Sequence, residues 1–288
     1  MAKLGTDPYK GVRDFYPEDM AIQNYIFNTW RKVAEKFEYV EYGASILEPA
    51  ELYKGKTSEE IVNDQTFSFT DRGGREVILR PEMTPTLARM IAAERKSLKF
   101  PLRWFSIPNV FRYERPQRGR RREHWQLNCD LLGIPGIEAD VEIISLAHAI
   151  LRAFGAEEKD FEIRINSRKA LPKGVSMETI RKIDKGEEVG IEVRETDEIR
   201  SVLDLLEKKG IKNARFNQKI VRGFDYYTGI VFEVFDTNPD NPRSLFGGGR
   251  YDNLLEIFDV DPIPAVGFGM GDITLRDFLE THKLKLNA

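Results

Sequence analysis

The sequence has 288 residues but only one cysteine, three histidines and no run of about 18 apolar residues. Cys129 has no second cysteine to pair with, which is typical of a protein that works in a reducing cytoplasm. Three histidines and one cysteine that lie far apart in the sequence do not predict a zinc site. Without a long apolar run or a charged-then-apolar N-terminus, neither a transmembrane helix nor a secretion signal is predicted. We therefore expect a cytoplasmic protein that does not use a membrane and holds no metal in a shell of its own side chains.

An excess of charge of one sign is also absent, since 44 basic and 47 acidic residues leave a formal net charge of -3. This balance argues against a protein that simply coats nucleic acid. The charge is uneven, however, because positions 112 to 122 hold several arginines and a single acid, Glu114. The arginines are Arg112, Arg115, Arg118, Arg120, Arg121 and Arg122. Such a run is either a solvated loop or a local trap for an anion.

The pattern of apolar residues predicts helices and strands in irregular alternation, which indicates an α+β fold. Pro17 and the two acids after it predict the start of a helix that ends near Tyr39. Turn residues at 71–74 join two alternating segments, 65–71 and 75–80, into an expected antiparallel hairpin. We also expect helices at 82–93 and 138–154, and strands that end at Pro49 or span 101–114, 123–133 and 161–165.

Residues 167–213 interrupt this pattern, because they are charged and broken by glycine and proline. A short insertion between two parts of one core, 1–166 and 214–288, explains them most simply, and a mobile lid is the alternative. Within the insertion only 196–209 predicts a convincing helix. After it we expect a strand that carries Arg222 and continues to Asp236, and then a turn at 247–252 that leads into a helix.

Several residues in these segments indicate a ligand site. Gln126, Asn128 and Asp130 alternate with apolar residues, so one face of their strand is polar. Arg222 stands beside paired tyrosines in an otherwise apolar segment, and a guanidinium is not buried cheaply without an anion opposite it. We therefore expect an anion site at Arg222.

A second extended segment, 266–271, has glycine at every other position. Its glycines are Gly267, Gly269 and Gly271. They share one face, and that face has no side chains, so a flat ligand can lie against the backbone there.

Three segments together resemble the histidyl-tRNA synthetases, a family of class II aminoacyl-tRNA synthetases. They are Phe111-Arg112-Tyr113-Glu114-Arg115-Pro116-Gln117, Leu79-Arg80-Pro81-Glu82-Met83-Thr84 and Arg222-Gly223-Phe224-Asp225-Tyr226-Tyr227-Thr228-Gly229. The first resembles motif 2 of the whole class, and the last resembles a segment specific to the histidine-type enzymes and their relatives. The resemblance runs from about Gly11 to Leu279 and implies an antiparallel sheet flanked by helices, in a catalytic core that works as a homodimer.

The resemblance implies an enzyme that joins histidine to ATP, giving histidyl-adenylate and pyrophosphate, and then transfers histidine to tRNA(His). Arg112 and Arg222 would be its catalytic residues, beside the α-phosphate and the histidine carboxylate. For histidine, Glu82, Thr84 and Gln126 would bind the ammonium group and Asp130 and Tyr227 the ring, while Tyr226 is either part of this set or part of the core. For ATP, the resemblance implies Arg112, Glu114, Arg120, Arg122, His124, Gly267, Gly269 and Gly271, with Mg²⁺ on the phosphates.

The chain departs from the family pattern in three places. Thr274 stands where class II motif 3 has an arginine for the γ-phosphate, so either Arg276 or Arg250 substitutes for it or ATP binding is weakened. His124 stands where many members have a phenylalanine that stacks on adenine. The sequence stops at Ala288, where the family continues into an anticodon-binding domain, so we expect tRNA(His) to dock only weakly, through its acceptor end.

These departures leave two other interpretations open. One is the regulatory subunit of ATP phosphoribosyltransferase in histidine biosynthesis, a catalytically silent relative without the anticodon-binding domain. The other is a binding module that holds RNA with the basic loop. The presence of Glu82, Arg112, Gln126 and Arg222 together favours the synthetase, because a regulator has no need for both arginines.

Overall fold

The computed structural model of the chain describes residues 4–54, 65–184 and 186–286. Its strands are β1 (Val40–Glu41), β2 (Leu47–Pro49), β3 (Phe67–Thr70), β4 (Glu76–Leu79), β5 (Leu102–Ser106), β6 (Asn109–Phe111), β7 (Glu123–Leu132), β8 (Phe161–Ser167), β9 (Ala214–Phe216), β10 (Ile230–Asp236), β11 (Ser244–Arg250) and β12 (Ala265–Gly271). Its helices are α1 (Pro17–Lys36), α2 (Glu51–Lys54), α4 (Thr84–Ala93), α5 (Ile137–Ala153), α6 (Met177–Asp184), α7 (Asp197–Lys208) and α8 (Asp272–Thr281), with 3-10 turns η1 (Arg168–Ala170) and η2 (Leu254–Phe258).

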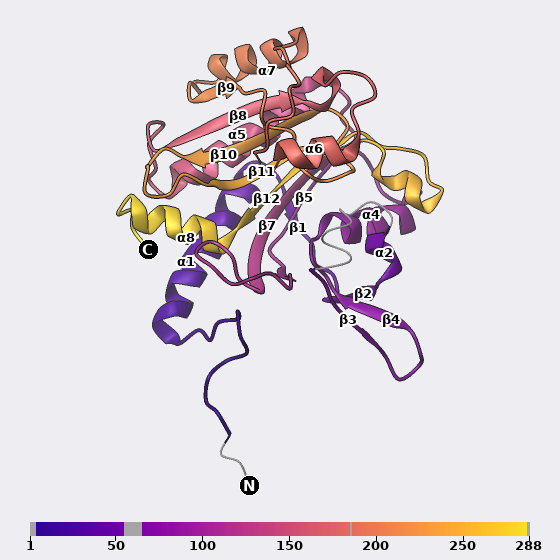
Figure 1. Cartoon of the computed structure of the whole chain (residues 1–288), viewed down its shortest axis with the longest axis vertical. Coiled ribbons are helices and arrows are strands. Elements are labelled where there is room, and N and C mark those ends of the chain that lie inside the picture. The colour runs from indigo at the N-terminus through magenta and orange to yellow at the C-terminus, as the bar shows by residue number, and fades with distance from the viewer. Residues whose placement is uncertain (1–3, 55–64, 185, 287–288) are drawn as a thin grey trace.

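The main sheet has the strand order β1-β5-β7-β12-β11-β10-β8-β9, and β6 pairs with β7 outside this path (Figure 1). Its strand pairs are antiparallel except β1 with β5 and β8 with β9. A smaller sheet, β2-β4-β3, contains the expected hairpin, whose turn is closed by Asp71 accepting from the backbone of Gly73 and Arg75. The mostly antiparallel sheet with flanking helices confirms the predicted class II α+β fold.

The alternation of β7 separates an apolar face from a polar one, as expected. Leu127, Cys129 and Leu131 are fully buried in the core against α1 and α5, while Gln126 and Asn128 face the opposite side of the sheet. Helix α1 begins with Pro17 and two acids in its first turn. The apolar face therefore fixes the sheet on its helices and leaves the other face free for a site.

Helix α7 is fastened to this core although it lies within the segment expected to be an insertion. Three of its residues, Ile199, Val202 and Leu206, belong to the main buried cluster. The side chain of Thr196 accepts from Ile199 N, which caps the helix. The short helix α6 instead packs Ile180 and Ile183 on Val221. The division into core, insertion and core stays a prediction.

Three sequence expectations about this fold are wrong. Arg222 does not lie in a strand, because β10 begins only at Ile230 and Arg222 has the left-handed backbone conformation, φ 57°. The glycines at 247–249 form part of β11 instead of a turn, and only a 3-10 turn follows them. The expected strand 101–114 is broken at Pro108, which cannot donate to a ladder, into β5 and β6.

Within the ranges that the structure describes, no helix is both long enough and apolar enough to cross a membrane.

Candidate active site

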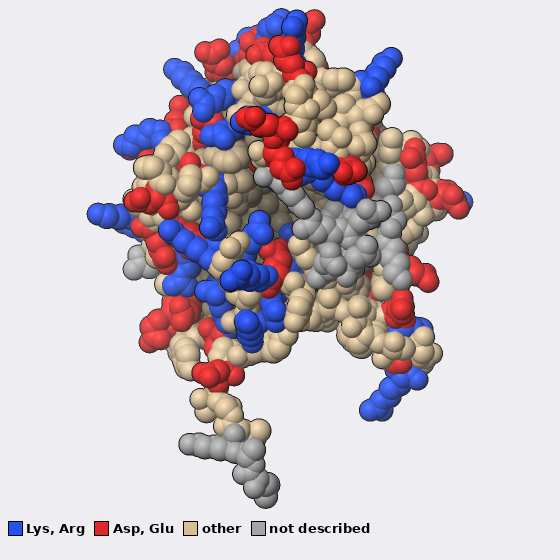
Figure 2. All heavy atoms as spheres, in the orientation of Figure 1, with Lys and Arg blue, Asp and Glu red and all other residues tan. Residues whose placement is uncertain are grey.

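Two adjoining hollows lie on the polar face of the main sheet. We call them the outer cleft, of about 670 Å³, and the inner pocket, of about 100 Å³. In Figure 2, Lys and Arg side chains gather around a hollow in the middle of this face, in the area where Figure 1 draws the β6–β7 loop and the end of β7. Both hollows are lined by Arg112, Gln126, Arg222, Phe224 and Gly269. They therefore form one continuous site with two compartments.

Pairing of β7 with β12 builds the floor of the site. Gly267 lies opposite Asp130, Gly269 opposite Asn128 and Gly271 opposite Gln126. A Cβ at Gly267 would overlap the carboxylate of Asp130, and a Cβ at Gly269 would overlap the amide of Gln126. These two glycines therefore make room for polar side chains of β7, which differs from the bare platform that the sequence suggested.

The glycines also divide between the two compartments. Gly267 lines the inner pocket, Gly271 lines the outer cleft, and Gly269 lines both. Gly267 therefore does not line the compartment that the arginine-rich β6–β7 loop lines, although the resemblance groups it with the residues for ATP.

Asp130 is a deeply buried carboxylate of the inner pocket, with 4% of the residue exposed. It accepts a hydrogen bond from the hydroxyl of Tyr251, a pocket residue that the sequence analysis did not select. Burial raises the pKa of Asp130 to about 7, although the bond from Tyr251 acts in the opposite direction. Asp130 is thus poised to change charge near neutral pH and to hydrogen-bond a ligand in either state.

The other carboxylate of the inner pocket is Glu82, just before α4. Its Oε2 accepts from the hydroxyl of Tyr226 at 3.1 Å, and its carbonyl accepts from Tyr53 at 3.2 Å. Thr84 and Tyr227 line the pocket beside them. Burial raises the pKa of Tyr226, and the charge of Glu82 raises it further, so the tyrosine stays a neutral donor. All six residues predicted to bind histidine therefore lie around this pocket: Glu82, Thr84, Gln126, Asp130, Tyr226 and Tyr227.

Arg112 and Arg222 stand where the two compartments meet. Arg112 follows β6 and is held by a bond from its Nε to the carbonyl of Pro81 at 2.9 Å. Arg222 forms an ion pair with Glu233 of β10. Burial disfavours its charge, but Glu233, Tyr227 and Asp184 together raise the pKa of Arg222 above the ordinary value, so it remains a cation. The anion paired with Arg222 in the structure is therefore Glu233, which corrects the expectation of a ligand anion alone.

The loop that carries Arg222 is tied down on both sides. Gly247 of β11 leaves space for the ion pair, since a Cβ there would come within 3.2 Å of Cζ of Arg222. Arg168 donates from its side chain to the carbonyl of Phe224 at 2.9 Å, and the backbone of Thr228 donates to the carbonyl of Arg250 at 2.8 Å. A non-glycine residue in the left-handed region costs energy, and such contacts are what hold it there.

The arginines of the β6–β7 loop do not all reach the outer cleft. Arg120 and Arg121 line it, together with Glu114, which pairs with Arg120 at 3.4 Å. Arg122 does not line it: its guanidinium lies over the ring of Tyr113, 3.8 Å from the centroid, and donates to Tyr9. The structure therefore brings Arg121 to the cleft, and not Arg122 as the resemblance implied.

His124 lines the outer cleft next to Gly271. Burial lowers the pKa of His124 to about 3, and the charges of Arg112 and Arg13 contribute to this shift. Its imidazole is therefore neutral at physiological pH and presents a flat, uncharged ring to the cleft.

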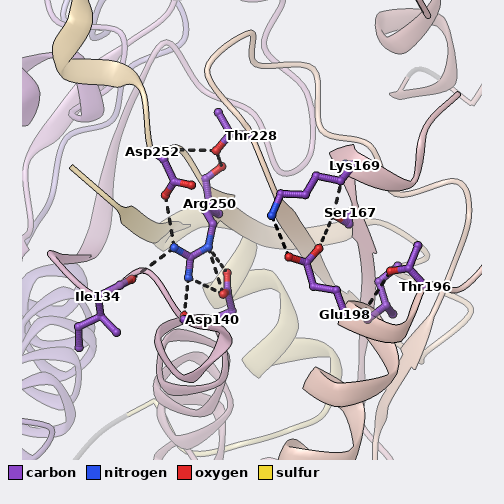
Figure 3. Close-up of polar contacts among 11 residues, drawn as sticks. Ile134, Asp140, Ser167, Lys169, Thr196, Glu198, Thr228, Arg250 and Asp252 are labelled. Carbon is purple, nitrogen blue, oxygen red and sulfur yellow. Dashed lines mark hydrogen bonds and ion pairs between the residues drawn. The ribbon is translucent and has the colours of Figure 1, made fainter. Parts of the chain in front are cut away.

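Neither arginine expected to replace the one missing at Thr274 reaches the cleft. Arg250 is buried and pairs with Asp140, donating also to the carbonyls of Ile134 and Gly136 (Figure 3). Arg276 pairs with Glu280 at 2.9 Å and with Asp19 at 3.4 Å. Neither lines the cleft, so the structure gives no support for substitution by either arginine, and weakened ATP binding stays the other alternative.

Figure 3 also shows the polar contacts that surround Arg250. The carboxylate of Asp252 accepts a hydrogen bond from Arg250, and the backbone N–H of Asp252 donates to the hydroxyl of Thr228. These bonds join the end of β11 to the loop that precedes β10. Beside Arg250, Glu198 of α7 accepts from Lys169 and Ser167, which fastens α7 to the end of β8. These contacts hold the frame of the site.

Helix α6 contributes two residues that the sequence analysis did not select. Arg181 and Asp184 line the outer cleft, as do residues of the β6–β7 loop. Arg181 donates to both carboxylate oxygens of Asp225, at 2.9 and 3.2 Å. The segment read as an insertion thus forms a wall of the site.

Within the described residues no three His, Cys, Asp or Glu side chains are grouped so as to hold a metal ion.

Comparison with known proteins connects this geometry to one family. The sequence model described as histidyl-tRNA synthetase matches residues 11–169 and 171–273. A histidine–tRNA ligase of Leptospira biflexa is 41% identical over 99% of this chain and 76% of the relative. One from Thermoplasma volcanium is 40% identical over 96% of this chain and 75% of the relative.

Two solved structures agree with the fold. The apo histidyl-tRNA synthetase of S. aureus is 25% identical, with a TM-score of 0.73 over 99% of this chain and 72% of that one. A protein from Bacillus halodurans described as an ATP phosphoribosyltransferase regulatory subunit/histidyl-tRNA synthetase has a TM-score of 0.77 at 23% identity, over 94% of this chain and 82% of that one. The second similarity concerns the fold alone.

Proposed function

This chain belongs to the histidyl-tRNA synthetase family, and we propose that its inner pocket binds histidine while its outer cleft binds ATP. Its function is that of a histidine–tRNA ligase, which activates histidine with ATP and joins it to tRNA(His). The curated relatives are named as ligases, so the regulatory-subunit alternative is not favoured. The observation that carries the proposal is that Arg112, Gln126 and Arg222 line both compartments.

The chemistry needs two anions to meet at one point. A carboxylate oxygen of histidine forms a bond to the α-phosphorus of ATP, the bond from that phosphorus to the bridging oxygen breaks, and pyrophosphate leaves. Negative charge develops on the α-phosphate oxygens, and cations fixed beside them stabilise it without reorganising. Arg112 and Arg222 are held by Pro81 and Glu233, so both are oriented before the substrates arrive.

The inner pocket suits histidine because it offers groups for each end of the molecule. Glu82, with Thr84 and Gln126, is a partner for the α-ammonium group. Asp130 and Tyr227 are partners for the ring nitrogens. A competitor without a ring N–H would make no hydrogen bond to the buried Asp130, which would keep only the bond from Tyr251, and this penalises the binding of the competitor. Gly267 serves this pocket by leaving room for Asp130.

The outer cleft suits ATP in size and charge. A cleft of about 670 Å³ is within the range of small-molecule sites. We assign the adenine to the neutral ring of His124 near Gly271, and the phosphates to Arg120 and Arg121. Mg²⁺ enters as the counter-ion of the triphosphate, near Glu114. Arg122 acts indirectly, by packing on Tyr113 at the base of the loop.

We propose that the small sheet contributes to a homodimer, because it exposes Leu47 and Phe69, which are 45% and 51% exposed. Mass determination in solution for the wild type and for Phe69→Asp tests the dimer, since the variant should shift toward monomer.

We also propose that the acceptor end of tRNA(His) reaches the site past the basic β6–β7 loop. The protein would work in the cytoplasm, where its buried free thiol, Cys129, stays reduced.

Histidine-dependent exchange of labelled pyrophosphate into ATP tests the proposed function. The wild type should exchange only when histidine is present, and Arg112→Met should lower the rate at least about hundredfold. Arg152→Met is a matched control, because Arg152 donates to the carbonyl of Ala156 at the far end of α5. A folded wild type without exchange would refute the proposal, and so would equal rates in the wild type and Arg112→Met.

A further inference from the structure

The triphosphate end of the outer cleft lacks the cation that motif 3 provides in the resemblance. Thr274, at this position in α8, donates its hydroxyl to the carbonyl of Leu245 at 2.7 Å and contributes no charge. Arg250 and Arg276 are engaged elsewhere. A triphosphate that lies against Thr274 therefore needs a positive charge from another element.

One arginine lies beside Thr274 in space. A Cβ placed on Gly119 would be 3.5 Å from Nη1 of Arg243, 3.8 Å from Cγ2 of Thr274 and 3.8 Å from Oδ2 of Asp277. Gly119 and Thr274 both line the outer cleft. Nη1 of Arg243 also donates to the carbonyl of Arg118. The guanidinium, which is not itself among the groups that line the cleft, is thereby held against Gly119 at the rim, next to the position where the family arginine is missing.

The rim has an excess of positive charge. Two acids lie in this cluster, Asp277 and Glu280, and Glu280 is paired with Arg276 at 2.9 Å. Burial raises the pKa of Asp277 and Glu280 adds to this, while the charges of Arg118, Arg243 and Arg121 act in the opposite direction, with Arg118 Nε 3.8 Å from the carboxylate. With Glu280 balanced by Arg276, three guanidinium groups around the Asp277 carboxylate leave a local charge of about +2. Figure 2 shows the corresponding gathering of Lys and Arg side chains over this part of the molecule. Such a rim attracts a polyanion.

We propose that Arg243, which immediately precedes β11, binds the terminal phosphates of ATP in place of the arginine that this chain lacks at position 274. The inference rests on the proposed binding of ATP in the outer cleft. Planar guanidinium groups bind phosphate through two parallel hydrogen bonds. Because the side chain comes from a different element, the same charge would reach the triphosphate from the opposite side of Thr274.

The test compares nucleotides with and without the terminal phosphates. Arg243→Met should raise the KM for ATP in the exchange assay about tenfold, since a charge-assisted hydrogen bond is lost at an exposed site. By calorimetric titration it should weaken ATP binding by a similar factor while leaving the Kd for AMP unchanged. Arg276→Met removes the same charge from α8, the helix that carries Thr274, and should change neither value.

A second variant tests whether a guanidinium group at this rim is sufficient for binding the terminal phosphates. Thr274→Arg, added to Arg243→Met, should recover most of the lost ATP affinity, because it returns a guanidinium to the same rim. The exposed position of Arg243 means that its loss should leave the unfolding midpoint unchanged.

The outcomes separate the inference from the proposed function. Absence of exchange by the folded wild type would refute the proposed function itself. Normal exchange by the wild type with an unchanged ATP-to-AMP affinity ratio in Arg243→Met would overturn only the inference. Loss of tRNA charging with normal ATP affinity would also overturn it, and would assign Arg243 to RNA. A tenfold loss that is specific to ATP and is rescued by Thr274→Arg would support it.

Discussion

Replacement of Asp130 by asparagine should stabilise the unliganded protein and weaken its binding of histidine. Asp130 is almost fully buried, and burial raises its pKa from 3.8 to about 7. This difference of about 3 pKa units corresponds to about 4 kcal/mol, because each unit is worth about 1.4 kcal/mol. The ionised carboxylate therefore destabilises the folded state by up to about this amount.

The direction of the pKa shift of Asp130 decides at which pH the buried carboxylate destabilises the folded protein. Because the folded-state pKa lies above the unfolded one, the penalty is complete above about pH 7 and is lost as the pH falls from about 7 toward 4. The asparagine side chain would carry no charge and could still accept the bond from Tyr251. The free energy of unfolding of the variant should exceed that of the wild type by about 2–4 kcal/mol near pH 8, and by less than half of that difference near pH 5.

Urea unfolding at the two pH values measures this difference, and calorimetric titration measures the affinity for histidine. Loss of a charge-assisted hydrogen bond to the ring should raise the Kd for histidine about tenfold to hundredfold. Tyr251→Phe is a useful companion, because losing its bond should move the pKa of Asp130 still higher. A variant that is less stable than the wild type at both pH values, with unchanged histidine affinity, would refute the reasoning and make Asp130 a structural residue.

Three further outcomes follow from the contacts of the site. Arg222→Ala should abolish exchange and also reduce the free energy of unfolding by about 3 kcal/mol, because it leaves Glu233, whose side chain is only 14% exposed, without its partner. Adding Glu233→Gln should restore stability in urea but not exchange. Arg250→Met should lower the unfolding free energy by a similar amount by stranding Asp140, yet leave the KM for ATP within about twofold, as steady-state exchange would show. His124→Phe should keep exchange within about threefold and leave its pH profile from about pH 5 to 8 unchanged, since the imidazole is already neutral there.

The sequence predicted best those features that depend on local periodicity. Alternation in β7 correctly separated Leu127 and Cys129 in the core from Gln126 and Asp130 in the site. The turn chemistry of the β3–β4 hairpin and the end of α4 at Ala93 were also predicted correctly. In each case the decisive interactions lie within a few residues of one another along the chain.

Long-range contacts account for what the sequence did not predict. Apolar and aromatic neighbours of Arg222 are typical of a strand, but the ion pair with Glu233 and contacts of the flanking residues hold it in a loop. Glycines at 247–249 suggested a turn, whereas β10 and β12 approach β11 too closely for a Cβ at these positions. Tyr251 could have been suspected only from the need for a partner of the buried Asp130.

The arginines show the same limit most clearly. Position in the sequence does not reveal that Arg122 packs on Tyr113, that Arg250 is buried with Asp140, or that Arg121 lines the cleft. All three are equivalent by composition, and their roles depend on which distant side chains surround them.

The histidine and ATP compartments meet at Arg112 and Arg222. A stable analogue of histidyl-adenylate, with a sulfamoyl link in place of the phosphate, tests this arrangement when its Kd is measured beside those of histidine and AMP. We expect the analogue to bind at least about hundredfold more tightly than either fragment, because it fills both compartments at once, and we expect Arg112→Met to remove most of this advantage. An analogue that binds no more tightly than histidine or AMP alone would contradict the claim that the two compartments form one active site.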